Sequence, residues 1–333
     1  MLILAIESSC DETSAAVVRM SEGERTILSN IIASQVDIHS VYGGVVPEIA
    51  SRAHIEAISG ITYEALETAG AGVGDIEAVG VTNRPGLIGA LLVGVNFAKS
   101  LAYSKGIPLV PVDHIKGHIA AAYFEYPDFE PPYTALVASG GHTAIYHVRS
   151  YTDFAEIGTT RDDAAGEAFD KVGRVIGLPY PGGAELDRLA SEGDAHAIKF
   201  PSPALIGDNL DFSFSGLKTA AINHINTAKM KGEDIRREDI AASYTRAVVD
   251  GIAKKTAAAL DMTHTDTLVL AGGVAANSHL RAALDKMCRR KKIRFCVPPR
   301  SLCGDNAAMI GAQAYYEFLA GTRAGTELNA YPN

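Results

Sequence analysis

The sequence contains the same series of elements twice, and this duplication constrains the fold more than any other feature. In each half a small polar turn, 7–14 or 139–143, lies between two apolar segments. The four apolar segments are 2–6, 15–18, 134–138 and 144–148. Two apolar runs joined by a turn of small residues predict a β-hairpin, so each half is expected to begin with one.

A second pattern follows each hairpin: an apolar strand, a glycine-rich loop, a helix and another strand. Its members are 78–82, 85–89, 90–104 and 108–112 in the first half, and 267–271, 272–274, 277–290 and 293–297 in the second. The second copy contains an inserted segment at 151–240. Repeated units of this kind predict two α/β lobes of one topology with a cleft between them, where ligands prefer to bind.

The duplicated hairpin and the Gly-Gly loop resemble those of the actin, sugar-kinase and heat-shock ATPase superfamily. This resemblance implies that the two hairpin turns face each other across a nucleotide. We expect an N-terminal lobe from residues 1–130, joined by a C-terminal helix at 305–325. We expect a C-terminal lobe from residues 131–304 that includes the inserted segment.

The composition excludes several classes of protein. With 47% apolar residues the chain is too apolar to be disordered, and no apolar run approaches the roughly 18 residues that span a bilayer. A net charge of −9 is unusual for a protein that binds nucleic acid by itself. The four cysteines form no C-x-x-C pair, and the first ten residues lack a basic signal region, so we expect a cytoplasmic protein without disulfides.

A candidate metal site follows the strand 108–112. His114 and His118 have helical spacing, which places both imidazoles on one face, and two His with a carboxylate suit zinc or non-haem iron. The alternative is a pair that decorates a helix surface. Asp305 precedes the last predicted helix and is a candidate third ligand, an N-cap, or both. The pair is not H-E-x-x-H, so a zincin protease would lack its general base.

Three further features have open interpretations. The loop 272–277 opens a helix and can receive a phosphate or an adenosine, or it is a plain turn. Asp170 and Asp187 flank the Pro-Gly-Gly turn 181–183 and can hold ribose hydroxyls, or they are solvated surface acids. The basic run 289–294 is either a phosphate-contact patch or a set of cations that stabilises a helix C-terminus.

The first hairpin turn carries Asp11 and Glu12, which can orient a metal-bound group or accept a proton. Both are also ordinary turn residues. Of the two, Asp11 is our candidate catalytic residue.

Together these motifs identify the chain as similar to the TsaD (Gcp) family, of the bacterial type. The resemblance covers nearly the whole chain, in segments 5–13, 44–48, 51–54, 83–87, 113–118, 139–143, 162–171, 212–219, 272–277 and 305–306. Gly304 and Ala307 depart from the Thr and Gly that bacterial relatives usually carry beside the metal aspartate. Val137 lies near the position where archaeal and eukaryotic relatives have a Tyr that reaches the metal.

The resemblance implies a tRNA N6-adenosine threonylcarbamoyltransferase. Such an enzyme moves the threonylcarbamoyl group of threonylcarbamoyl-AMP to the adenosine that follows the anticodon, position 37, in tRNAs reading ANN codons. AMP is released and t6A is formed. The resemblance also implies two partners, a TsaB-like paralogue and a TsaE-like ATPase, and no membrane.

The same resemblance assigns the site residues. One Fe²⁺ or Zn²⁺ per subunit would be held by His114, His118 and Asp305. Contacts to the substrate adenylate would come from Val137, Ala138, Ser139, Gly140, Gly141, Asp170, Gly183, Asp187 and Asn277.

Three other classes compete with this interpretation. A kinase or ATPase of the same superfamily would bind Mg²⁺, which prefers oxygen ligands to a His pair. A metalloprotease would need a general-base Glu near that pair. A scaffold subunit would have no use for His114, His118 and Asp305.

Overall fold

Two compact units make up the computed structural model, which describes residues 1–205, 207 and 209–333. Unit 1 comprises Met1–Pro131, Ser150–Asp153 and Pro298–Asn333. Unit 2 comprises Pro132–Arg149 and Phe154–Val297. Positions 206 and 208 of the predicted inserted segment lie outside the described residues.

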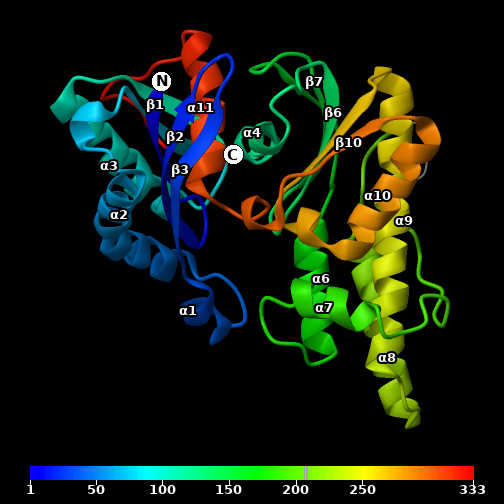
Figure 1. Cartoon of the computed structure of the whole chain (residues 1–333). Coiled ribbons are helices and arrows are strands. Elements are labelled where there is room, and N and C mark those ends of the chain that lie inside the picture. Colours follow the sequence, from blue (N-terminus) through cyan, green and yellow to red (C-terminus); the bar gives the residue numbers. More distant parts are fainter. Residues whose placement is uncertain (206, 208) are drawn as a thin grey trace. The chain divides into compact units, whose positions relative to one another are not determined.

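Unit 1 is built on a five-stranded sheet in the order β3-β2-β1-β4-β5 (Figure 1). Neighbouring strands are antiparallel from β3 to β1 and parallel from β1 to β5. The strands are β1 (Leu2–Glu7), β2 (Glu12–Met20), β3 (Arg25–Ser34), β4 (Ala78–Arg84) and β5 (Leu109–Asp113). The helices are α1 (Val36–Ser40), α2 (Pro47–Ala69), η1 (Val73–Asp75), α3 (Ile88–Lys105), α4 (His114–Ala120), α5 (Ala122–Glu125), η3 (Arg300–Leu302) and α11 (Ala307–Leu319).

Helices cover both faces of this sheet, as the uninterrupted burial of its central strands requires. Leu4 and Ile6 of β1 belong to one core cluster with buried residues of α2 and α3. On the other face, α11 approaches so closely that a Cβ on Gly80 would lie 2.6 Å from the Cβ of Ala314. The return of α11 to this sheet brings residues near 305 beside β1, β2 and α4.

Unit 2 is built on a second five-stranded sheet, in the order β10-β9-β6-β7-β8. The strands are β6 (Tyr133–Ala138), β7 (Thr143–Val148), β8 (Phe154–Thr159), β9 (Thr267–Ala271) and β10 (Arg294–Cys296). The helices are α6 (Ala165–Val175), α7 (Gly183–Ala190), α8 (Ser215–Lys231), α9 (Arg237–Thr263), η2 (Gly273–Ala276) and α10 (Ser278–Lys291).

The two sheets have one topology, which confirms the predicted duplication. The hairpin β1–β2 corresponds to β6–β7, and the parallel pair β4–β5 corresponds to β9–β10. Within each unit, the hairpin turn therefore leaves the sheet at the edge where the parallel strands have their carboxyl ends. Among the described residues, every helix is too short or too polar to cross a membrane.

Candidate metal centre

Helix α4 places two imidazoles side by side directly after β5. The carboxylate of Asp113 caps this helix by accepting the backbone N–H groups of Ile115 and Lys116 at 2.9 and 3.3 Å, so α4 begins at His114. The ring centroids of His114 and His118 lie 4.6 Å apart, and both side chains are buried. The pair is therefore an internal feature of unit 1 and not the surface decoration that the spacing alone allowed.

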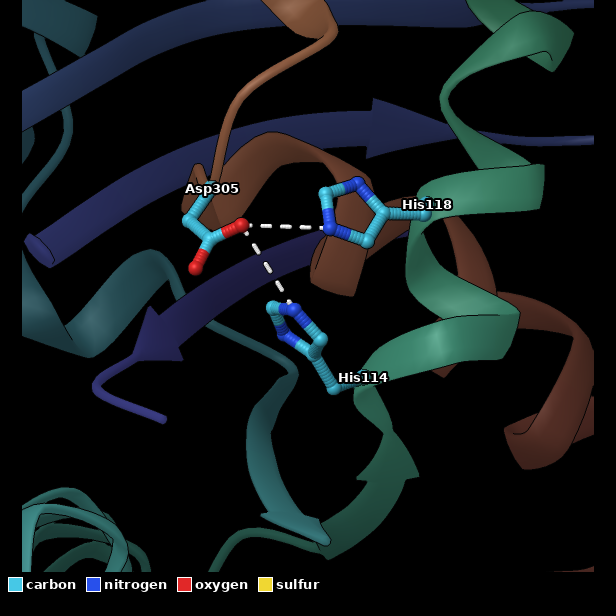
Figure 2. A group of neighbouring side chains, drawn as sticks. All are labelled: His114, His118 and Asp305. Atoms are coloured by element: carbon cyan, nitrogen blue, oxygen red, sulfur yellow. Dashed lines mark ion pairs between the residues drawn. The ribbon is translucent and has the colours of Figure 1, made fainter. Parts of the chain in front are cut away.

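Asp305 meets the pair from the segment before α11. Its Oδ1 lies 3.1 Å from His118 Nε2 and 3.5 Å from His114 Nε2 (Figure 2). Asp305 does not cap α11, which corrects that alternative. Asn306 is the cap, because its side-chain oxygen accepts the Met309 N–H at 3.1 Å while its amide nitrogen donates to the Gly304 carbonyl at 2.9 Å.

The donor atoms of His114, His118 and Asp305 all lie within 4.8 Å of one another, so the group can hold a metal ion. An independent observation supports this fit. Within the described part of the chain, neither ring nitrogen of the buried His118 makes a hydrogen bond. His118 Nε2 does lie 3.1 Å from Asp305 Oδ1, but an imidazole buried without a hydrogen bond costs free energy that a metal–nitrogen bond would recover. Two nitrogens and one carboxylate oxygen are a donor set typical of zinc and of iron(II).

Glu7, at the end of β1, orients His114. Its fully buried carboxylate lies 3.0 Å from His114 Nδ1, which leaves Nε2 directed toward Asp305. The same carboxylate accepts hydrogen bonds of 2.5 Å from the Ser9 N–H and the Thr82 hydroxyl. A carboxylate behind a ligating imidazole fixes its tautomer and increases its basicity. This role of Glu7 was not predicted from the sequence, although an acid that ends an otherwise apolar strand was a usable signal.

The close contact between Glu7 and His114 shifts the pKa of each group. Burial alone would raise the pKa of Glu7, but the His114 ring and its hydrogen bonds hold that pKa below the ordinary value. Burial alone would lower the pKa of His114, but the charges of Glu7 and Asp305 raise it to about 9. The anions that favour a proton on the ring also favour a metal cation at the same place.

The β1–β2 turn adds further acidic groups beside this centre. Burial, followed by the charges of Asp305 and Asp11, raises the pKa of Glu12 to about 9. Burial also raises the pKa of the Cys10 thiol, which is therefore not a ready nucleophile. The buried His54 holds the turn through Thr13 Oγ1 at 2.7 Å and the Cys10 carbonyl at 3.0 Å. Asp11 is thus carried on a well-supported turn.

In unit 2 the β6–β7 turn is closely packed against glycines. A Cβ on Gly166 would lie 2.7 Å from the Ser139 carbonyl oxygen, and one on Gly272 would lie 2.4 Å from that of Ala138. Val137 and Ala138 are fully buried, backbone included. Gly140 and Gly141 are exposed at the tip of the turn.

The remaining candidate residues of unit 2 make defined backbone contacts around α7 and α10. Asp170 Oδ1 accepts the N–H groups of Gly182 and Gly183 at 2.8 and 3.1 Å. Both carboxylate oxygens of Asp187 lie 3.1 Å from the Ser278 N–H, and Asn277 Oδ1 caps α10 by accepting the Leu280 N–H at 2.8 Å. Neither aspartate is the solvated surface acid that the sequence allowed as an alternative.

Comparison with known proteins gives a consistent result. A family model described as "TsaD: tRNA N6-adenosine threonylcarbamoyltransferase" matches residues 26–312. The tRNA N6-adenosine threonylcarbamoyltransferase of Clostridium botulinum (strain 657 / Type Ba4) is 54% identical over 331 residues, which cover 99% of this chain and 96% of the relative.

Two solved structures of low sequence identity are similar to this chain in fold only. Component A of the (R)-2-hydroxyglutaryl-CoA dehydratase of Acidaminococcus fermentans is 17% identical, with a TM-score of 0.56, and the match covers 96% of this chain and 99% of that one. A ROK family glucokinase from Streptomyces griseus is 15% identical, with a TM-score of 0.52 and coverage of 95% and 99%. The predicted sugar-kinase-like fold is confirmed.

Proposed function

Because the chain belongs to the TsaD family of tRNA N6-adenosine threonylcarbamoyltransferases, we propose that it forms t6A in tRNA with His114, His118 and Asp305 at the reaction centre. The observation that carries the proposal is the conjunction of two findings. The chain is 54% identical to an enzyme of that name over nearly its whole length. It also keeps a buried group that can hold a metal ion.

The proposed donor is threonylcarbamoyl-AMP and the acceptor is N6 of adenosine 37 in tRNAs that read ANN codons. A bond forms between N6 and the carbamoyl carbon, the bond from that carbon to the phosphate oxygen breaks, and AMP leaves. The N6 amine loses one proton. The adenine has to leave its stack in the anticodon loop before N6 can react.

The proposed metal is Fe²⁺ or Zn²⁺, which when bound would polarise a carbonyl as a Lewis acid and contribute several kcal/mol of charge stabilisation. His114, His118 and Asp305 would hold it, and Glu7 would keep His114 in the ligating tautomer.

Asp11 is the proposed acceptor of the N6 proton. Burial is the largest cause that raises the pKa of the neighbouring Glu12 carboxyl, and because burial disfavours the charged form, Glu12 is the poorer candidate for this role. This argument favours Asp11 over Glu12 within the same turn.

Residues of unit 2 are proposed to bind the adenylate portion of the donor. They are Val137, Ala138, Ser139, Gly140, Gly141, Asp170, Gly183, Asp187 and Asn277. Support comes from the exposed backbone of Gly140 and Gly141, from the Asp187 carboxylate at the N-terminus of α10, and from the Asp170 carboxylate at the N-terminus of α7. Backbone N–H groups and helix N-termini favour phosphate, and carboxylates favour ribose hydroxyls.

We further propose that a TsaB-like paralogue and a TsaE-like ATPase assist the chain in the cytoplasm. The net charge of −9 supports a need for help in holding a polyanionic substrate.

The test is mass spectrometry of nucleosides from tRNA of cells depleted of the protein. Depletion should remove t6A, and wild type should restore it while His114→Ala should not. His196→Ala is the matched control, because His196 is exposed and lies in unit 2. Persistence of t6A after depletion would show that another protein performs the reaction.

A further inference from the structure

Six cations within nine residues form a surface that the proposed function does not use. We call this surface the basic edge: Lys286, Arg289, Arg290, Lys291, Lys292 and Arg294. All six side chains are exposed. They lie on the last two turns of α10 and at the start of β10, the edge strand of the unit 2 sheet. Residues 286–294 contain no acid, in a chain whose net charge is −9.

Acidic neighbours neutralise only part of the basic edge. Arg289 pairs with Asp285 at 2.9 Å and Lys291 pairs with Asp261 at 2.5 Å. Lys286, Arg290 and Lys292 form no ion pair with any described residue. Lys286 and Arg290 are four residues apart on α10, so they project from the same helix face.

Helix stabilisation does not explain this concentration of charge. Cations near a helix C-terminus are favourable, but the effect falls off within the last turn and needs only one or two charges. Lys286 and Arg294 lie outside that turn. The longest helix, α9, ends without a cation in its last turn, as do α2 and α11, so helices of this chain end stably without a basic cluster.

The backbone at Lys292 supplies an independent observation. Lys292 ends α10 in the left-handed conformation, with φ of 58°. At the corresponding position α2, α3 and α8 have Gly70, Gly106 and Gly232, which adopt this conformation without a steric penalty, whereas α9 ends on His264 with φ of 53°. A lysine is strained there, so α10 accepts a less favourable backbone and retains a sixth positive charge.

We propose that the basic edge binds the phosphate backbone of tRNA. This inference rests on the proposed function, since it takes tRNA as the substrate. An acidic chain can attract a polyanion only where cations are concentrated and outnumber the acids beside them. The basic edge meets both conditions, because Lys286, Arg290 and Lys292 keep their charge without an acidic partner among the described residues. Contacts to phosphate are independent of base sequence, so one surface can serve every tRNA that carries the target adenosine.

The test uses the metal-loaded full-length chain with its partner proteins, threonylcarbamoyl-AMP and a tRNA transcript. We compare wild type with the triple variant Lys286→Gln, Arg290→Gln, Lys292→Gly. The loss of three phosphate contacts should raise the KM for tRNA by roughly tenfold or more. It should also make the plot of the logarithm of the tRNA association constant against the logarithm of the salt concentration less steep, by about 2 to 3 in slope. The kcat at saturating tRNA should not change, and the Tm should not fall, because glycine relieves the strain at position 292.

The matched control is Lys229→Gln with Lys231→Gln, two exposed cations in the last turn of α8. This variant should keep the wild-type KM and salt slope. The proposal is wrong if the triple variant keeps both values, or if it weakens binding of a partner protein and leaves tRNA binding intact. If the wild-type protein binds tRNA but forms no t6A, the proposed function is wrong. The basic edge is still tested in that case, because the salt dependence of tRNA binding can be compared between wild type and the triple variant.

Discussion

Replacing Glu7 with glutamine should lower the metal affinity of the His114 centre without changing a metal ligand. Glu7→Gln keeps the side-chain volume but removes the negative charge 3.0 Å from His114 Nδ1. Loss of such a carboxylate typically weakens metal binding 10- to 100-fold, which corresponds to about 1.4–2.7 kcal/mol. The fully buried position of Glu7 favours the upper part of this range, because water does not screen the lost interaction.

The assay is a competition titration of Zn²⁺ against a chromophoric chelator, combined with thermal unfolding. Glu77→Gln is the control, because Glu77 is an exposed carboxylate that accepts the Leu2 N–H in the same unit. Unfolding should show some loss of stability, since Ser9 and Thr82 lose a charged acceptor.

A double-mutant cycle distinguishes the effect of Glu7 on the orientation of His114 from a general disturbance of the site. In a His114→Ala background, Glu7→Gln should have little further effect on metal affinity, because Glu7 acts through the ring that is now missing. An unchanged affinity in the folded single variant would refute the positioning role. The positioning role would also be refuted if Glu7→Gln reduced metal affinity equally in the presence and absence of His114.

Three other perturbations give clear expectations. His118→Ala should abolish metal binding and threonylcarbamoyl transfer without changing the circular dichroism spectrum. Elemental analysis and nucleoside mass spectrometry test this expectation, and full activity without metal would contradict it. Asn306→Ala should lower the free energy of unfolding by about 1–2 kcal/mol in a denaturant titration, because α11 loses its cap; an unchanged midpoint would contradict the capping role. Gly80→Ala should destabilise by about 1–3 kcal/mol, because its Cβ would collide with Ala314, and a stable variant would show that α11 can shift. Its control, Gly60→Ala in α2, has open space and should stabilise by about 0.5–1 kcal/mol in the same titration.

The parts of the fold and site that depend on local periodicity were predictable. The strands and helices of both repeats lie within a few residues of their expected positions, since alternation and glycine placement are encoded locally. The His114–His118 pair follows from helical spacing in the same way.

The parts that depend on contacts between distant segments were not predictable from pattern. Asp305 and Asn306 are both good N-cap residues, and the choice between them depends on the backbone at Asn306 and its bond to Gly304. The role of Glu7 depends on β1 lying beside α4, and the partners of Asp187 depend on α7 lying beside α10. The position of Asp305 before the last predicted helix made it only one candidate for the third ligand, and the family resemblance then assigned it to the His pair.

The discontinuity of unit 1 has a consequence for how the protein is synthesised. A ribosome adds about 5–20 residues per second, so the roughly 190 residues between His118 and Asp305 delay the third ligand by roughly 10–40 s. During that interval the nascent chain has its two imidazoles but not the carboxylate that completes the group. If the group holds a metal ion as proposed, strong binding of that ion would mark a chain whose translation has passed residue 305 and whose α11 has packed onto the first sheet.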